Sequence, residues 1–344
     1  MIKMEKDSTG SFYYYLSEGC RLCYKGAKMV LFVTGICGKN CFYCPVSEER
    51  KEKDVVFANE KRVEKDDDVI DAATAMDALG TGITGGEPLL RLDRVIYYIK
   101  LLKNRFGSSH HIHLYTALSP NKAVLGSLKN AGLDEIRFHP PPQLWKNIGN
   151  NYYGYSIRWA HELGLSTGVE IPSIASDLNG IISLLEEVDG FLNLNELEFS
   201  ETNIEELKKR GFVPVGDTSS ASCGSKEVAE ALNWKRLHFC SSGFKDAIQL
   251  RERLKRTAKR TARDFDEITE DGTLVYGVIE GKSPDILIEA GVTDDMYAIM
   301  GGSIETAWWI ATDLAEELKK IGRSAWVIER YPMKDGIVME KEHL

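Results

Sequence analysis

The chain has 344 residues, of which 43% are hydrophobic and 28% are charged, as in ordinary globular proteins. Its formal net charge of −9 and isoelectric point near 5.5 argue against a protein that binds nucleic acid over its whole surface. The sequence contains no bilayer-spanning apolar run and begins with no signal peptide, so we expect a cytoplasmic protein. Its seven cysteines should then be thiols or metal ligands rather than disulfides.

The first segment, residues 1–28, is polar and aromatic and carries Cys20 and Cys23. A buried strand is predicted over 28–35, because this stretch is apolar, rich in β-branched residues and closed by glycine. A loop with three further cysteines follows, and the charged stretch 48–68 is predicted as a solvated loop and helix start. Helical and strand patterns then alternate. Helices are predicted over 67–80, 91–107, 121–132, 152–164, 178–190 and 203–211, and strands over 81–88, 111–118, 134–141, 166–174, 194–201 and 235–242.

This alternation is typical of an α/β fold with a parallel sheet and right-handed crossovers. Six or seven βα units predict a barrel or an open barrel, in which the loops after the strands carry the chemistry. Beyond residue 245 a basic helix is predicted over 245–265, strands over 273–281, 324–332 and 335–344, and an amphipathic helix over 303–322. We therefore predict an N-terminal segment 1–28, a barrel core 29–245 and a small α+β C-terminal region 246–344.

The loop after the first predicted strand contains Cys37, Cys41 and Cys44, spaced C-x3-C-x2-C. Cysteine thiolates hold zinc or iron–sulfur clusters, and an incomplete ligand shell leaves a position open for another molecule. Three thiols without a fourth Cys or His in the loop favour a cubane cluster with one iron free. A zinc knuckle and a thioredoxin-like pair, Cys41 with Cys44, are the alternatives, although a redox pair normally opens a helix.

A second motif, GITGGEP over 82–88, follows the second predicted strand. Glycines permit close approach of the backbone, and carbonyl groups together with the Glu87 carboxylate can accept hydrogen bonds from an ammonium group. Together, CGKNCFYC and this motif resemble the signature loop and the GGE motif of the radical SAM superfamily. The resemblance is closest to the pyruvate formate-lyase activating enzyme branch and to archaeal proteins related to it. The chain departs from that branch in its leading CRLC and in its C-terminal region.

The resemblance implies a partial (βα)6 barrel in which Cys37, Cys41 and Cys44 ligate a [4Fe–4S] cluster. The open iron would chelate S-adenosylmethionine (SAM), whose reductive cleavage yields a 5′-deoxyadenosyl radical. It also implies SAM contacts from the loop and the GGE motif and an electron donor such as ferredoxin or flavodoxin. The cofactor-binding candidates are Tyr43, Thr84, Gly85, Gly86, Glu87, Thr116, His139, Glu170 and Glu198.

Four of these candidates lie on later predicted strands. Thr116 matches a strand end that contacts SAM in the family, and His139 ends the next strand. Glu170 stands in an apolar strand, where an unpaired carboxylate is costly, so it should bind the ribose or substrate, or pair with a barrel cation. Glu196 and Glu198 should share one face of a strand, with Glu198 pointing inward.

The four cysteines outside the loop are Cys20, Cys23, Cys223 and Cys240. Because the first and last strands of a barrel lie close together, these thiols could form a second, closed site for zinc or an iron–sulfur cluster. The alternative is that they are free or buried thiols. Seven basic residues between 250 and 263 suggest an RNA partner, although an exposed helix paired with Asp66, Asp67 and Asp68 is favoured slightly over it.

The leading hypothesis is a radical SAM enzyme that abstracts hydrogen from a protein, an RNA or a small metabolite. A non-catalytic zinc module that binds RNA is the alternative. Iron content and release of 5′-deoxyadenosine distinguish the two.

Overall fold

The computed structural model describes residues 3–333 and 336–344 and, at Asp246, the backbone alone. The chain divides into two compact units, one comprising Met1–Thr74 and Ala78–Gln249, the other Ala75–Asp77 and Leu250–Leu344.

Seven parallel strands form the sheet of the first unit, in the order β13-β10-β9-β8-β7-β6-β3. In chain order they are β3 (Lys28–Phe32), β6 (Gly80–Thr84), β7 (His111–Thr116), β8 (Glu135–Phe138), β9 (Ser166–Pro172), β10 (Phe191–Asn195) and β13 (Leu237–Cys240). The two outer parallel strands, β3 and β13, do not pair with each other, so the barrel is open. Short antiparallel strands extend both edges: β1 (Glu5–Lys6) and β2 (Phe12–Tyr13) beside β13, and β4 (Phe57–Ala58) and β5 (Lys61–Arg62) beside β3.

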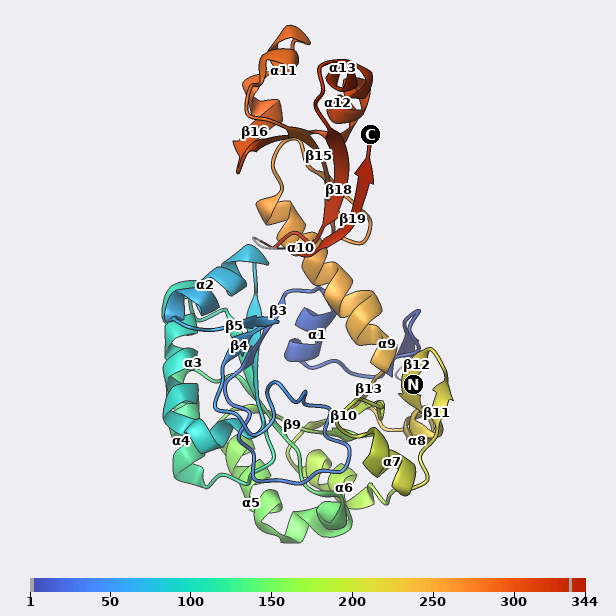
Figure 1. Ribbon diagram of the computed structural model, residues 1–344. Helices are drawn as coiled ribbons and strands as arrows, with labels where there is room; N and C mark the ends of the chain where they lie inside the picture. Colours follow the sequence, from blue (N-terminus) through green and yellow to red (C-terminus); the bar gives the residue numbers. More distant parts are fainter. Residues whose placement is uncertain (1–2, 334–335) are drawn as a thin grey trace. The chain divides into compact units, whose positions relative to one another are not determined.

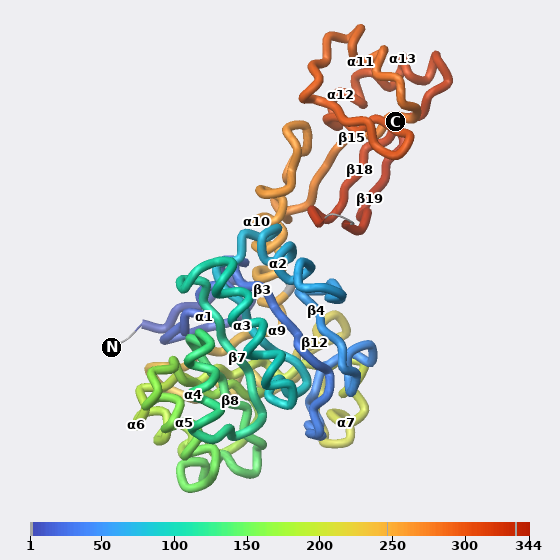
Figure 2. Tube along the Cα trace, turned by 90° about the vertical axis from the view of Figure 1, so that its left-hand side faces the viewer, coloured from blue at the N-terminus to red at the C-terminus, as the bar shows by residue number. Residues whose placement is uncertain are grey.

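Helices cover the outside of this sheet, as Figure 1 shows. They are α2 (Asp66–Ala75), α3 (Leu92–Phe106), α4 (Lys122–Ala131), α5 (Tyr152–Glu162), α6 (Asn179–Glu187) and α7 (Ile204–Lys209), with the 3₁₀ segments η1 (Pro88–Arg91) and η2 (Pro142–Asn150). In Figure 2, α3, α4 and α5 follow one another outside β7 and β8. The predicted α/β fold with a partial, open parallel barrel is therefore confirmed.

The inner face of the parallel sheet is polar, whereas the outer face is apolar. On β8, Glu135 and Arg137 point inward, and Ile136 and Phe138 are completely buried on the helix side. The same alternation holds for β10, where Leu192 and Leu194 face outward. The inward residues of β10 and β13 are Asn193, Asn195, His238 and Cys240. Because successive side chains of a strand alternate between faces, the sheet buries an apolar layer outside and encloses a polar space inside.

Helix α1 (Glu18–Tyr24) lies on the inner side of the sheet and covers the amino ends of its strands. A Cβ atom at Gly19 would lie 2.5 Å from Arg137 and 2.6 Å from His113, so only glycine permits this close packing. Ser17 begins the helix by accepting a hydrogen bond from the Cys20 amide at 3.4 Å. The segment that the sequence suggested only as polar and aromatic is thus a helix that closes one end of the barrel.

The remaining elements of the first unit lie in its last crossover, between β10 and β13, or directly after β13. They are the hairpin β11 (Pro214–Gly216) and β12 (Ser219–Ser222), α8 (Ser225–Glu230), α9 (Ser242–Phe244) and the π-helix η3 (Lys245–Leu250), whose last residue belongs to the second unit. One predicted strand is wrong in position. The strand expected over 194–201 is Phe191–Asn195, because Leu192 and Leu194 supply its buried outward residues.

The second unit is a small antiparallel α+β domain built on the order β16-β17-β15-β18-β19, with β14 also paired to β15. Its strands are β14 (Glu267–Ile268), β15 (Leu274–Glu280), β16 (Tyr297–Met300), β17 (Ser303–Thr306), β18 (Ala325–Arg330) and β19 (Val338–His343). Its helices are α10 (Arg251–Thr261), α11 (Asp285–Glu289), η4 (Asp294–Met296), α12 (Trp308–Asp313) and α13 (Ala315–Lys320).

Two differences from the sequence prediction concern this unit. The helix expected over 303–322 begins as strand β17, because Ile304 packs into the core of the unit while Ser303–Thr306 pair with β15. The strand expected over 335–344 is present as β19, although the first residue of that range lies outside the described residues.

Candidate active site

The cysteine loop leaves the carboxyl end of β3 and folds back on itself. The Gly35 amide donates to the Lys53 carbonyl at 2.8 Å, and the Glu52 amide donates to the Gly35 carbonyl at 3.0 Å. Any Cβ atom at Gly35 would collide with the Arg50 carbonyl, so glycine is required at this crossing. Cys37, Cys41 and Cys44 are half-buried free thiols on this loop and line the same cavity.

Tyr43 holds the loop against the barrel. Its ring packs with Leu197 and Leu207, and the Asn203 side chain donates to its carbonyl at 3.2 Å. Its hydroxyl lies 2.9 Å from Nε2 of His139, whose Nδ1 lies 2.7 Å from the Glu170 carbonyl. Because a carbonyl can only accept, we assign the proton of His139 to Nδ1, and Nε2 then accepts from Tyr43. Burial lowers the pKa of His139, which keeps this imidazole neutral.

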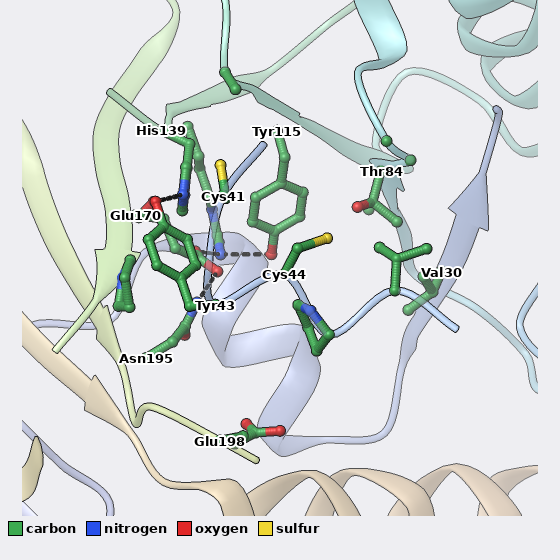
Figure 3. A pocket seen from close by; sticks show the side chains of 18 of the residues that line it. Val30, Cys41, Tyr43, Cys44, Thr84, Tyr115, His139, Glu170, Asn195 and Glu198 are labelled. Carbon is green, nitrogen blue, oxygen red and sulfur yellow. Dashed lines mark hydrogen bonds and ion pairs between the residues drawn. The ribbon is translucent and has the colours of Figure 1, made fainter. Parts of the chain in front are cut away.

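Figure 3 shows Tyr43 and His139 beside Cys41, with Glu170 and Asn195 facing the same space. The two predicted residues Tyr43 and His139 are thus brought together by the fold. These contacts position the loop. The Tyr43 hydroxyl joins it to His139 at the end of β8, His139 is joined in turn to β9, and Asn203 at the start of α7 binds the Tyr43 carbonyl.

The GGE turn packs directly against the cysteine loop. The Gly86 amide donates to the Thr34 carbonyl at 2.7 Å, and the Glu87 amide donates to the Ile36 carbonyl at 2.9 Å. A Cβ at Gly85 would lie 2.6 Å from the Thr34 oxygen, and one at Gly86 would lie 2.5 Å from the Gly35 oxygen. The two glycines therefore let the turn approach another backbone segment, in addition to exposing Thr84, Gly85 and Gly86 to the cavity.

The expectation for the Glu87 carboxylate needs correction. This side chain is completely buried and accepts hydrogen bonds from the Leu89 amide at 3.0 Å, the Ala117 amide at 2.6 Å and the Thr116 hydroxyl at 2.8 Å. The Glu87 carboxylate does not line the cavity. It points instead toward η1 and the end of β7, which supply these three hydrogen-bond donors. Burial raises the pKa of Glu87 despite these donors. Thr116 lines the cavity, but its hydroxyl is committed to Glu87.

A buried network of charges crosses the middle of the barrel. Arg137, 2% exposed, donates to Glu135 at 2.6 Å, to Glu170 at 2.7 Å and to the Tyr115 hydroxyl at 3.0 Å. Burial raises the pKa of Glu170, but Arg137 and the amides of Asn193 and Asn195 outweigh it and lower that pKa to about 2. Of the two roles expected for Glu170, the structure shows the ion pair with a barrel cation.

Glu196 and Glu198 follow β10 rather than lying on it, so the predicted shared strand face is wrong. The Glu196 carboxylate accepts from the Ser242 amide at 2.8 Å, and Glu198 forms an ion pair with Lys245. Both side chains still line the cavity rim. The sequence prediction did not include six inward polar residues of the strands, although their period-two spacing identifies them once the strand bounds are known. They are Lys28, Tyr115, Arg137, Asn193, Asn195 and His238.

One cavity of about 680 Å³ joins the two ends of the barrel interior. The three loop cysteines and Thr84–Gly86 line it at the carboxyl ends of the strands, and Cys20, Cys23 and Lys28 line it near α1. Its volume lies within the range of small-molecule sites, about 300–1,000 Å³.

Three of the four cysteines predicted to form a second site lie together on the cavity wall, and Cys223 does not. Cys20, Cys23 and Cys240 line the cavity, and burial, with the nearby Cys23 and Cys20, raises the pKa of Cys240. Burial also raises the pKa of Cys20, but Arg137 and His238 outweigh it and lower that pKa to about 6. Cys223 is exposed on the far side of the β11–β12 hairpin, where its thiol contacts the Pro214 carbonyl at 3.5 Å. The cavity places His238, not Cys223, beside the other three thiols.

Comparison with known proteins agrees with this geometry. The model of the Radical SAM superfamily matches residues 31–143, which include the cysteine loop and the GGE turn. The chain belongs to the radical SAM superfamily.

Among its relatives is the protein named "Putative glycyl-radical enzyme activating enzyme MJ0021" of Methanocaldococcus jannaschii. The two are 40% identical over 346 residues, which cover 95% of this chain and 92% of that protein. Residues 272–344 match a domain of unknown function, DUF8061. Among solved structures, the crystal structure of methylornithine synthase (PylB) aligns with a TM-score of 0.40 and 13% identity, over 62% of this chain and 63% of that one.

The predicted activating-enzyme relationship is confirmed, and the chain is a radical SAM enzyme. The family implies a [4Fe–4S] cluster and SAM as cofactors. The family membership therefore favours the enzyme over the alternative hypothesis of a non-catalytic zinc module. No helix within the described residues is long and apolar enough to cross a membrane.

Proposed function

We propose that Cys37, Cys41 and Cys44 hold a [4Fe–4S] cluster whose open iron binds SAM, and that the substrate enters the barrel cavity beside it. The supporting observation is that three thiols, the Thr84–Gly86 edge and an inward polar face line one cavity. Across residues 3–333 and 336–344, no three His, Cys, Asp or Glu side chains converge on a single metal ion. The loop thiols therefore suit a multi-iron cluster better than a zinc knuckle.

When bound, the reduced cluster supplies the electron that cleaves SAM to methionine and a 5′-deoxyadenosyl radical, which takes one hydrogen atom from the substrate. The chain's residues position this reaction. Tyr43 and His139 hold the loop at the barrel mouth, and Glu87 holds the GGE turn against β7. Thr84, Gly85 and Gly86 line the cavity; the Thr84 carbonyl accepts from the Val33 amide at 2.9 Å, so the carbonyls of Gly85 and Gly86 are our candidates to accept from the SAM ammonium group.

The relative of Methanocaldococcus jannaschii is named as a putative activating enzyme of a glycyl-radical enzyme, and we propose that the hydrogen donor here is the backbone of a protein glycine. Such a donor is a short, flexible segment that would reach the cavity from the mouth, where Glu196, Glu198 and Lys245 stand at the rim. Ferredoxin or flavodoxin would supply the electron.

Anaerobically reconstituted protein should absorb visible light and release 5′-deoxyadenosine from SAM when reduced with dithionite. Cys41→Ala should abolish this release, whereas Cys223→Ala, an exposed thiol outside the cavity, should leave it intact. Persistent cleavage in Cys41→Ala would show that our ligand assignment is wrong. For the protein substrate, a glycyl-radical enzyme co-incubated with the reduced enzyme and SAM should develop a glycine-centred signal in electron paramagnetic resonance. If SAM cleavage is robust but no such signal forms with the glycyl-radical enzymes tested, the proposed substrate class is contradicted for them.

A further inference from the structure

A second group of soft donors lines the cavity at the end opposite the cysteine loop. Cys20 and Cys23 stand three residues apart on α1, so both side chains occupy one face of that helix, and both line the cavity. His238 and Cys240 stand two residues apart on β13, so both point inward from that strand. We call these four residues the inner thiol cluster.

His238 is the member whose surroundings best suit a ligand. Its side chain is only 3% exposed, and neither ring nitrogen makes a hydrogen bond of normal geometry among the described residues, while the Cys20 thiol lies near enough to interact with it. The rings of Tyr13 and Tyr24 flank it at centroid distances of 6.3 and 6.1 Å and supply no polar contact to those nitrogens. A buried imidazole without partners is costly, and a bound metal would remove that cost by coordinating one nitrogen.

Hydrogen-bond donors and one buried cation near the cluster suit bound thiolates, although the charge of Arg137 is already balanced by Glu135 and Glu170. The Arg137 guanidinium and the Asn193 amide approach the Cys20 sulfur at 3.5 and 3.3 Å. Lys28, 5% exposed, contacts His113 at 3.3 Å, and no ion pair joins it to a carboxylate within the described residues. Thiolates bound to metal carry net negative charge, and hydrogen bonds to their sulfurs are a usual part of such sites.

We propose that Cys20, Cys23, Cys240 and His238 ligate a second iron–sulfur cluster, with a closed set of four protein ligands. Three cysteines and one histidine form a complete soft donor set, unlike the open set of the loop. The four donors do not converge on a single metal ion, and the same is true of the three loop thiols. A cluster binds its ligands through more than one iron and does not require the four donors to meet at one point, as mononuclear zinc does. The fold excludes Cys223 from this set because it lies on the outer hairpin.

The test removes the first cluster so that the second can be counted. The variant Cys37→Ala/Cys41→Ala/Cys44→Ala is reconstituted anaerobically with iron and sulfide, desalted and assayed for iron, acid-labile sulfide and zinc. We expect about two to four irons per chain with matching sulfide in this variant, and about four irons more in the unaltered protein, which also holds the [4Fe–4S] cluster of the loop. Adding Cys20→Ala and Cys23→Ala should remove the remaining iron, whereas adding Cys223→Ala should not.

A separate variant guards against loss of folding. In the triple-variant background, His238→Cys should retain the iron but change the electron paramagnetic resonance spectrum of the reduced cluster, because one ligand changes from nitrogen to sulfur. Circular dichroism of each variant confirms that the barrel remains folded.

Several results would overturn the proposal: a folded triple variant with only trace iron, one that binds zinc in place of iron and sulfide, or a spectrum that His238→Cys leaves unchanged. The outcome is independent of the proposed function. Iron retained by the triple variant supports the second cluster even if the unaltered protein fails to cleave SAM.

Discussion

Arg137 is the residue whose loss should most disturb the barrel. The side chain is 2% exposed and is paired with two carboxylates, Glu135 at 2.5 Å and Glu170 at 2.7 Å. In Arg137→Met the methylene volume is largely kept, but both acids lose their cation. Removing one partner of a buried ion pair typically costs about 3–5 kcal/mol.

The stability expected to be lost in Arg137→Met can be estimated more closely from the hydrogen bonds that the two carboxylates keep. Glu170 keeps two amide donors, and Glu135 keeps Ser17 at 3.2 Å and the Gly19 amide at 3.3 Å. Both carboxylates therefore keep hydrogen-bond donors, and we expect the free energy of unfolding to fall by about 4–5 kcal/mol, less than twice the loss for a single ion pair. For a unit of this size, that corresponds to a fall in melting temperature of about 10–15 °C.

The assay is thermal unfolding of metal-free protein followed by circular dichroism under anaerobic conditions. Arg158→Met serves as the control, because Arg158 pairs with Glu187 on the exposed helix surface and should cost less than about 1 kcal/mol. Adding Glu135→Gln and Glu170→Gln to Arg137→Met should recover part of the loss. A melting temperature within about 2 °C of the unaltered protein would refute the reasoning, and failure of the added changes to recover stability would assign the loss to packing instead of charge.

Three further predictions concern the loop, the turn and acid stability. Gly86→Ala should lower stability by about 1–3 kcal/mol and reduce the iron bound after reconstitution, because the new Cβ would lie 2.5 Å from the Gly35 oxygen. Gly126→Ala is the matched control, since nothing lies within 4 Å of its new Cβ, and equal iron contents in the two variants would contradict the prediction. Tyr43→Phe should lower SAM cleavage by loosening the loop and reduce stability by about 1 kcal/mol, since the imidazole partner loses its donor; unchanged cleavage rates would argue against a positioning role. Because the pKa of Glu170 falls to about 2 in the fold, its contribution is present above its ordinary pKa near 4.3 and should be lost, by about 3 kcal/mol, as pH falls from 5 toward 2. Unfolding titrations in denaturant across that range should show a shallower fall for Glu170→Gln, and identical slopes would contradict the assignment.

Several features were legible in the sequence because they depend on local spacing. The C-x3-C-x2-C loop and the GGE turn are each contained within a few residues of a strand end, so their proximity followed from the parallel order of β3 and β6. The alternation of helix and strand patterns likewise predicted the open barrel, because each crossover is a local unit.

The direction of individual side chains could not be read in the same way. Glu87 was expected to face SAM, but the backbone of the turn places its carboxylate against Thr116 and Ala117 of another strand end. The predicted strand containing Glu198 was shifted because LNELEF also alternates, and only the burial of Leu192 and Leu194 on the outer, helix-covered face selects the true register.

The sequence by itself determined the class of the enzyme, since three thiols at this spacing and two glycines before a glutamate form short motifs independent of distant contacts. Only the tertiary structure decided the composition of the barrel interior. A period-two pattern separates the two faces of a strand but does not say which face the helices cover. The inward positions of Arg137 and Asn193 therefore follow only from the tertiary structure. The same limit applies to the inner thiol cluster. Its members come from the first helix and the last parallel strand, and His238 joins them in place of Cys223 because β13 turns that imidazole toward α1 while the hairpin carries the cysteine outward.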